Sequence, residues 1–171
     1  MHTPTRYRTA ATAAVVMLAL ASCASGGKTD ASKPTITEVQ AKQQVMAYDL
    51  DILSTLLGEQ QAMVSEPFSS ECETSSQPGP KGRVRLHSSD HGLGVVAVER
   101  NPGMFETFRK HLAEKGFEPV NKDAGWEYYK NKANGFTAEL QESSDASKKL
   151  TLTVSSPCVW PNGTPGPDAN R

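Results

Sequence analysis

Two segments are decisive for the fold: Phe136-Thr137-Ala138-Glu139-Leu140-Gln141 and Leu150-Thr151-Leu152-Thr153-Val154. Apolar and polar residues alternate along each of them. A period of two is typical of a β-strand with one buried and one solvated face. The polar residues 143–147 lie between the two segments and supply a turn. The stretch therefore predicts two neighbouring antiparallel strands with one dry face.

Segments upstream extend this sheet. Two more strands are predicted at Phe117–Val120 and Trp126–Lys130, and the turn residues Asn134-Gly135 follow the second of them. The short spacing of the turns predicts an antiparallel meander. Residues 83–87 alternate in the same way and predict another strand. Residues 92–100 are apolar in part and fit either a further strand or a loop over the core.

Two helices are predicted. Thr35-Ile36-Thr37-Glu38 has the form of a capping box that starts the first helix, and Gly58 ends it. Its expected apolar face consists of Val39, Met46, Leu50, Leu53 and Leu57, widened by Val45, Ile52 and Leu56. Asn101-Pro102 is expected to cap and open the second helix, which ends at Gly116. Its buried face is expected at Phe105, Phe108 and Leu112.

The N-terminal residues have the pattern of a secretory leader. Arg6 and Arg8 precede the apolar run Ala10–Ala21, which is too short to span a membrane that needs roughly 20 helical residues. Leu20-Ala21-Ser22-Cys23 resembles the bacterial lipobox, whose cysteine is lipidated before cleavage. We therefore predict a lipoprotein signal peptide at residues 1–22 and a lipid anchor on Cys23, which holds the protein on the extracytoplasmic face of the cell membrane. The alternative is an ordinary secreted protein in which Cys23 is a free thiol.

Composition divides the rest of the chain. Residues 23–35 are small and polar and predict a flexible tether after the lipidated cysteine. Residues 36–160 are long enough for a single domain with one core. Residues 161–171 are rich in Gly and Pro and predict a disordered tail. Without the leader the net charge is about −3, which together with the lack of a large basic cluster excludes nucleic acid as a partner.

Cys72 and Cys158 remain once Cys23 is assigned to lipid. In an oxidising compartment a lone pair of cysteines most simply forms a disulfide. The alternative, a metal site on the two thiolates, lacks histidine or cysteine neighbours at the spacing of zinc sites. The expected fold class is thus α+β: an antiparallel sheet of about four to six strands, two helices packed on one face, and one disulfide.

No motif in the chain indicates catalysis. His87, Asp90 and His91 are weak candidates for metal ligands, since a site needs at least three converging groups and nothing fixes their geometry. Glu139 and Glu142 are close in sequence, but neighbouring positions on a wet strand give the same pattern without function. Nucleophile and phosphate-binding motifs are lacking. We predict no catalytic residue, no metal and no cofactor, and a binder is favoured over an enzyme.

Four aromatic residues are candidates for binding: Trp126, Tyr128, Tyr129 and Trp160. Alternation places Trp126 and Tyr128 on one face of a strand and Tyr129 on the other. The favoured interpretation is that Trp126 and Tyr128 fill the core while Tyr129 shields the strand. The alternative leaves at least one large ring partly exposed, where it would bind a carbohydrate, a peptide or a lipid surface.

The C-terminal part resembles small extracytoplasmic lipoproteins of actinobacteria, including mycobacteria. The resemblance lies in Ser155-Ser156-Pro157-Cys158-Val159 after the last strand, in the helix-Gly-aromatic turn Leu112–Phe117, and in the leader. It implies the compartment and the disulfide and no catalytic residue. The expected function is a membrane-anchored, non-catalytic binding or accessory module for an envelope protein, lipid or glycan. The alternatives are a small extracytoplasmic hydrolase, or a structural protein that self-associates through its long helix.

Overall fold

The structure, a computed structural model, describes residues 32–59, 62–72, 81–91, 93 and 97–166. The predicted leader, Cys23 and most of the tether lie outside the described residues. The elements are, in chain order, α1 (Glu38–Leu57), β1 (Phe68–Glu71), β2 (Val84–His91), the 3-10 helix η1 (Val98–Arg100), α2 (Asn101–Glu114), β3 (Phe117–Asp123), β4 (Trp126–Asn131), β5 (Thr137–Glu142) and β6 (Leu150–Ser155). In the described part of the chain no helix is long and apolar enough to cross a membrane.

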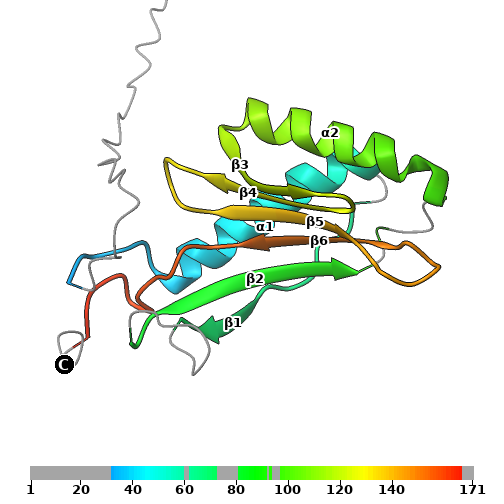
Figure 1. Cartoon of the computed structure of the whole chain (residues 1–171). Coiled ribbons are helices and arrows are strands. Elements are labelled where there is room, and N and C mark those ends of the chain that lie inside the picture. Colours follow the sequence, from blue (N-terminus) through cyan, green and yellow to red (C-terminus); the bar gives the residue numbers. More distant parts are fainter. Residues whose placement is uncertain (1–31, 60–61, 73–80, 92, 94–96, 167–171) are drawn as a thin grey trace, which may run out of the picture.

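The six strands form one antiparallel sheet in the order β1-β2-β6-β5-β4-β3 (Figure 1). Strands β3 to β6 form the predicted meander, and β6 then pairs with β2 instead of remaining an edge. Leu140 on β5 lies opposite Leu152 on β6, so the apolar residues of the two decisive segments share one face. The α+β class and the antiparallel sheet are confirmed.

Both helices pack on the same face of this sheet, as predicted. Phe108 of α2 is fully buried and meets Tyr129 of β4 edge to face, with ring centroids 5.6 Å apart. Helix α1 lies over β2 and β6 and also contacts α2. Asp51 on α1 accepts hydrogen bonds from His111 and Lys115 at the end of α2, which joins the two helices. The core therefore lies between one helical layer and one face of the sheet.

The buried face of α1 differs from the prediction. Val39, Met46 and Leu50 are 66%, 40% and 47% exposed. The buried side chains are those of Ala41, Val45, Asp49, Ile52, Leu53 and Leu56. Asp49 lies in the middle of this face and accepts a hydrogen bond of 2.7 Å from Ser88, so a carboxylate interrupts the apolar pattern where the helix is most buried.

The start of α1 is also shifted. Thr37, not Thr35, is the N-cap: its hydroxyl accepts a hydrogen bond from the backbone N–H of Gln40, whose side chain in turn accepts from the N–H of Thr37. A Gln therefore takes the place that we assigned to Glu38 in the capping box. The predicted end is confirmed, since Gly58 caps the helix with a φ of +88°, a conformation that favours glycine.

Two segments, one before β2 and one at the start of α2, differ from what the sequence predicts. Residues 68–71, for which no strand is predicted above, form the edge strand β1 on β2. The second helix follows the 3-10 turn η1 directly, so Asn101 is not its cap. The Asn101 amide instead donates hydrogen bonds of 2.8 Å to Glu142 and to the carbonyl oxygen of Lys148, which ties α2 to the β5–β6 turn. The undecided stretch 92–100 contains η1, and residues 92 and 94–96 lie outside the described residues.

A disulfide joins Cys72 to Cys158, with Cα atoms 6.0 Å apart, and thereby confirms the predicted pairing. It connects the end of β1 with the segment after β6. The ends of the domain lie farther out than the tether and tail boundaries at 35 and 161. The carbonyl oxygen of Lys33 accepts a hydrogen bond from the Trp160 indole, and the N–H of Thr35 donates to Gly163. Pro161 and Gly163, expected in the disordered tail, therefore accept hydrogen bonds from Glu38 and Thr35 at the start of α1.

Candidate binding site on the open sheet face

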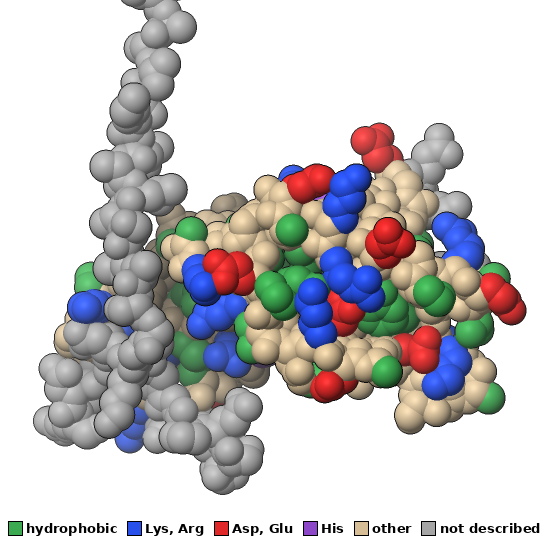
Figure 2. Space-filling model, turned by 45° about the horizontal axis from the view of Figure 1, so that its top comes forward, with side chains coloured by type: hydrophobic (Ala, Val, Ile, Leu, Met, Phe, Trp, Pro, Cys, Tyr) green, Lys and Arg blue, Asp and Glu red, His purple; other side chains and the backbone are tan. Residues whose placement is uncertain are grey.

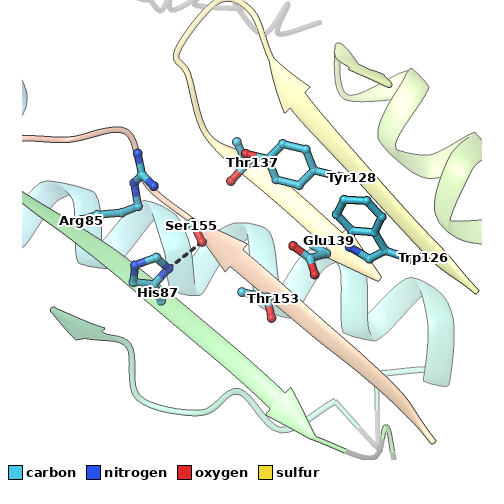
Figure 3. Close-up of a pocket in the computed structure, with 8 residues that line it drawn as sticks. All are labelled: Arg85, His87, Trp126, Tyr128, Thr137, Glu139, Thr153 and Ser155. Atoms are coloured by element: carbon cyan, nitrogen blue, oxygen red, sulfur yellow. Dashed lines mark hydrogen bonds between the residues drawn. The ribbon is translucent and has the colours of Figure 1, made fainter. Parts of the chain in front are cut away.

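The face of the sheet opposite the helices is not covered by any described element (Figure 1). Successive side chains of a strand point to opposite faces, so each residue between two core positions faces outward here. An open pocket of about 350 Å³ lies on this face. It is lined from four strands by Arg85, His87, Trp126, Tyr128, Thr137, Glu139, Thr153 and Ser155 (Figure 3).

Strand register brings these residues together from distant parts of the chain. Tyr128 lies opposite Glu139, and Glu139 lies opposite Thr153, so the three form one row across β4, β5 and β6. Trp126 precedes Tyr128 by two residues and lies on the same face, about 7 Å along the strand. Figure 3 shows both rings beside the Glu139 carboxylate. The centre of the pocket is therefore a carboxylate flanked by two aromatic rings.

Side chains of the two strands that flank β2 hold His87 in place. One ring nitrogen of His87 lies 2.8 Å from the Ser155 hydroxyl and the other 3.0 Å from the Ser70 hydroxyl. The ring also stacks on Phe68, with centroids 5.3 Å apart. Burial and the positive charge of Arg85 lower the pKa of His87 below its ordinary value. His87 is thus neutral at neutral pH and lines the pocket with both ring nitrogens engaged by serine hydroxyls.

Five polar groups of the pocket have no hydrogen-bond partner among the described residues. They are the Trp126 indole N–H, the Tyr128 hydroxyl, the Thr137 and Thr153 hydroxyls, and the Glu139 carboxylate. All five side chains are half-buried. Half-buried polar groups that the protein leaves unpaired hydrogen-bond to water or to a ligand. These five groups are therefore available to water or to a ligand on the open face.

Arg85 forms the cationic end of the pocket. One of its terminal nitrogens donates to Cys158 Sγ at 3.5 Å, so the disulfide helps to hold the guanidinium. Its Nε is buried and has no partner among the described residues. Because Glu139 carries the opposite charge and His87 is neutral, the pocket has no net charge.

The predicted aromatic candidates divide into two pairs. Trp126 and Tyr128 lie on the open face, so the interpretation that they fill the core is wrong. Tyr129 and Trp160 are only 2% and 3% exposed and lie away from the pocket. Burial, together with the nearby Glu127 carboxylate, raises the pKa of Tyr129 to about 12. Both rings are engaged inside the domain: the Tyr129 hydroxyl donates to Glu127, and the Trp160 indole donates to the carbonyl oxygen of Lys33.

The metal candidates do not converge on a described site. Both ring nitrogens of His87 are engaged by serine hydroxyls, and the side chains of Asp90 and His91 lie outside the described part. Within the described residues, no cluster of three or more His, Cys, Asp or Glu side chains has the arrangement of a metal site.

The pairing of His87 with Ser155 does not make a hydrolytic site. The second nitrogen of His87 meets the Ser70 hydroxyl instead of an orienting carboxylate. Ser155 lies in a strand paired on both sides, so the backbone N–H groups around it serve the sheet and do not form an oxyanion hole. Glu139 and Glu142 lie on opposite faces of β5, and Glu142 is bound by Asn101 and Lys148. They form no catalytic pair.

A second pocket, of about 550 Å³, lies between α2 and the β3–β4 turn. Its charged groups are largely paired with one another: Arg109 with Glu127 at 2.7 Å and Lys148 with Glu142 at 3.3 Å. These pairs tie α2 to the sheet, and we assign this pocket a structural role. Figure 2 shows acidic and basic side chains interspersed over this side of the molecule, without a large patch of one sign.

Fold and site together define an open-faced α+β domain with an aromatic, hydroxyl-rich pocket on its uncovered sheet. No protein-family model matches the chain, and none of the curated proteins matches it. Among solved structures, the chain is similar to the "putative lipoprotein LppA" from Mycobacterium tuberculosis. That match has 12% sequence identity and a TM-score of 0.37, and it covers 77% of this chain and 87% of the other. A similarity of this level transfers neither residues nor activity to this chain.

Proposed function

We propose that this protein is a lipid-anchored binding module of the bacterial cell envelope that holds its partner on the open sheet face. The observation that carries the proposal is the convergence of two half-buried aromatic rings, whose polar atoms are among five groups without a hydrogen-bond partner in the described part of the chain. Interfaces concentrate their binding energy in such aromatic positions, where one face of the ring is available to a partner.

The three cysteines support the proposed location in two ways. The leader and Cys23 have the pattern of a lipoprotein, and the Cys72–Cys158 bond is typical of proteins outside the cytoplasm. The polar residues between Cys23 and the start of the described domain serve as a tether. They hold the domain near the membrane while the sheet face remains accessible.

The anchor is tested by feeding cells a clickable fatty-acid analogue. Wild-type protein should take up the label, whereas Cys23→Ala should remain unlabelled and uncleaved. A Cys72→Ser and Cys158→Ser double variant is the matched control and should still be labelled, because its lipid site is intact. Equal labelling of the Cys23→Ala variant would contradict the anchor.

The binding face is tested by placing a photoreactive amino acid at Thr153, in the pocket, in intact cells. Lys110, an exposed residue on α2, is the matched control position. We expect a discrete crosslinked species from position 153 that is absent from position 110. The same products from both positions, or none from position 153, would contradict a binding role for the sheet face.

A second candidate function is self-association through α1. It is favoured by the exposed side chains of Val39, Met46 and Leu50, which recur at helical spacing on the outer side of α1. Analytical ultracentrifugation of the soluble domain tests it. A dimer that Met46→Glu dissociates would support this role, and a monomer at high concentration would remove it.

A further inference from the structure

We infer that the ligand of the open-face pocket is a saccharide, bound as a short neutral segment of a glycan. The inference rests on the proposed function and names the class of ligand for the same site. Three properties of the pocket carry it: its hydrogen-bonding groups, its aromatic rings and its charge.

The hydrogen-bonding groups match a polyhydroxylated ligand. Each sugar hydroxyl both donates and accepts a hydrogen bond, so it needs a mixed set of partners. The pocket offers an acceptor in Glu139, a donor in the Trp126 indole, and groups of both kinds in Tyr128, Thr137 and Thr153. The two carboxylate oxygens of Glu139 can accept from two adjacent hydroxyls of one sugar ring at the same time.

The aromatic rings supply the apolar contact. One face of a pyranose ring consists of C–H groups, which pack on the face of an aromatic side chain. Trp126 and Tyr128 stand about 7 Å apart on one strand, and both flank Glu139. A sugar that stacks on either ring therefore brings its hydroxyls to the carboxylate.

Charge and size exclude the main competitors. A phosphate-rich polymer would meet the Glu139 carboxylate at the centre, with Arg85 as the one cationic residue in the lining. An acyl chain would leave the five polar groups unpaired and dry, which is costly. The volume of about 350 Å³ is at the lower end of the range for small-ligand sites, roughly 300–1,000 Å³. It suits a short saccharide unit better than an extended polymer.

The experiment uses the soluble domain from residue 24 onward, with the disulfide formed. The probes are neutral oligosaccharides built from glucose, mannose, galactose, arabinose and N-acetylglucosamine units, together with glycan fragments from a muramidase digest of bacterial cell wall. Binding is followed by tryptophan fluorescence, because Trp126 lines the pocket while Trp160 is buried elsewhere. We expect at least one probe to give a saturable change, which Trp126→Phe abolishes.

Isothermal calorimetry on variants then locates the site. Glu139→Gln, which keeps the shape of the side chain but removes its charge, should weaken binding by about tenfold or more. Glu118→Gln on β3, outside the pocket, is the matched control and should bind like wild type. Both variants should keep the wild-type melting temperature, so that a loss of binding is not a loss of fold.

The outcomes separate this inference from the proposed function. No saturable binding by any probe overturns the saccharide inference, and so does binding that Glu139→Gln and Trp126→Ala leave unchanged. If the crosslink from position 153 then captures a protein, the binding role of the face stands with a peptide partner. If position 153 also gives no crosslink, both proposals fail.

Discussion

Removing the disulfide is the perturbation whose magnitude follows most directly from the structure. The bond between Cys72 and Cys158 spans 86 residues of sequence, so it restricts the conformational freedom of the unfolded chain over most of the domain. For a closed loop of this length, the chain-entropy relation gives a stabilisation of about 4.5 kcal/mol at 25 °C. We expect the Cys72→Ser and Cys158→Ser double variant to lose between about 3 and about 5 kcal/mol of its free energy of unfolding.

The structure also indicates that the double variant loses protection first in β1. Strand β1 has four residues, pairs with β2 alone and lies at the edge of the sheet, so the disulfide is its main covalent restraint. In the double variant, amide hydrogen exchange in β1 should accelerate more than exchange in β5 or β6. Strands β5 and β6 are paired on both sides and should stay protected up to global unfolding.

Urea denaturation followed by circular dichroism measures the loss. The denatured state of the variant is less constrained, so the urea dependence of the free energy should also steepen. Wild-type protein reduced with dithiothreitol is the control and should match the double variant. A loss below about 1 kcal/mol, or reduced wild type that behaves like oxidised wild type, would refute the view that this bond stabilises the domain through its unfolded chain.

Three further perturbations test the core, the hydrogen bonds of the buried Asn101 side chain and a titrating group. Phe108→Ala removes a fully buried ring and should cost about 3–5 kcal/mol in urea denaturation; a cost below about 1 kcal/mol would contradict its central place in the core. Asn101→Ala deletes the two hydrogen bonds to Glu142 and Lys148 and should cost about 1–2 kcal/mol, with faster hydrogen exchange in the β5–β6 turn as its local sign. Because burial lowers the pKa of His87 below 6.5, the unfolded chain takes up this proton before the folded protein does as the pH falls. The free energy of unfolding should therefore decrease as the pH drops through about 6.5, and His87→Gln should remove that component; an identical pH profile of the variant would contradict the assignment.

The strand meander was readable from the sequence because its alternation is regular. The apolar residues of β5 and β6 recur at every second position, and Gly125 and Gly135 mark the two preceding turns of the meander. The pairing of β2 with β6 was not readable, since it joins segments about 65 residues apart and no local pattern encodes such a contact. The same holds for β1, whose residues Phe68–Glu71 lack a clear alternation.

The register of α1 was misread for a specific physical reason. Asp49 is buried and hydrogen-bonded to Ser88, so the true inner face contains a charge-bearing residue. Leu50, next to it in sequence, is exposed and looked like part of the core. Apolar periodicity identifies a buried face only where buried polar groups are absent.

The candidate site was only half visible for a related reason. Trp126 and Tyr128 were correctly grouped on one face of β4, but one strand does not reveal which face the helices cover. Thr137, Glu139 and Thr153 are the solvent-facing residues of the decisive segments. They become part of a site only when strand pairing brings them beside Tyr128. Aligning the wet positions of β4, β5 and β6 across their turns would have grouped them.

If the protein works as proposed, the open sheet face is occupied in the cell, and oxidative footprinting of Trp126 measures that occupancy. Hydroxyl radicals are generated around intact cells and around the purified domain, and oxidation of Trp126 is compared by mass spectrometry with that of the buried Trp160 as internal reference. We predict that Trp126 is oxidised in the purified domain and protected several-fold in cells, while Trp160 stays protected in both. Equal oxidation of Trp126 in cells and in the purified domain would contradict the proposed occupancy.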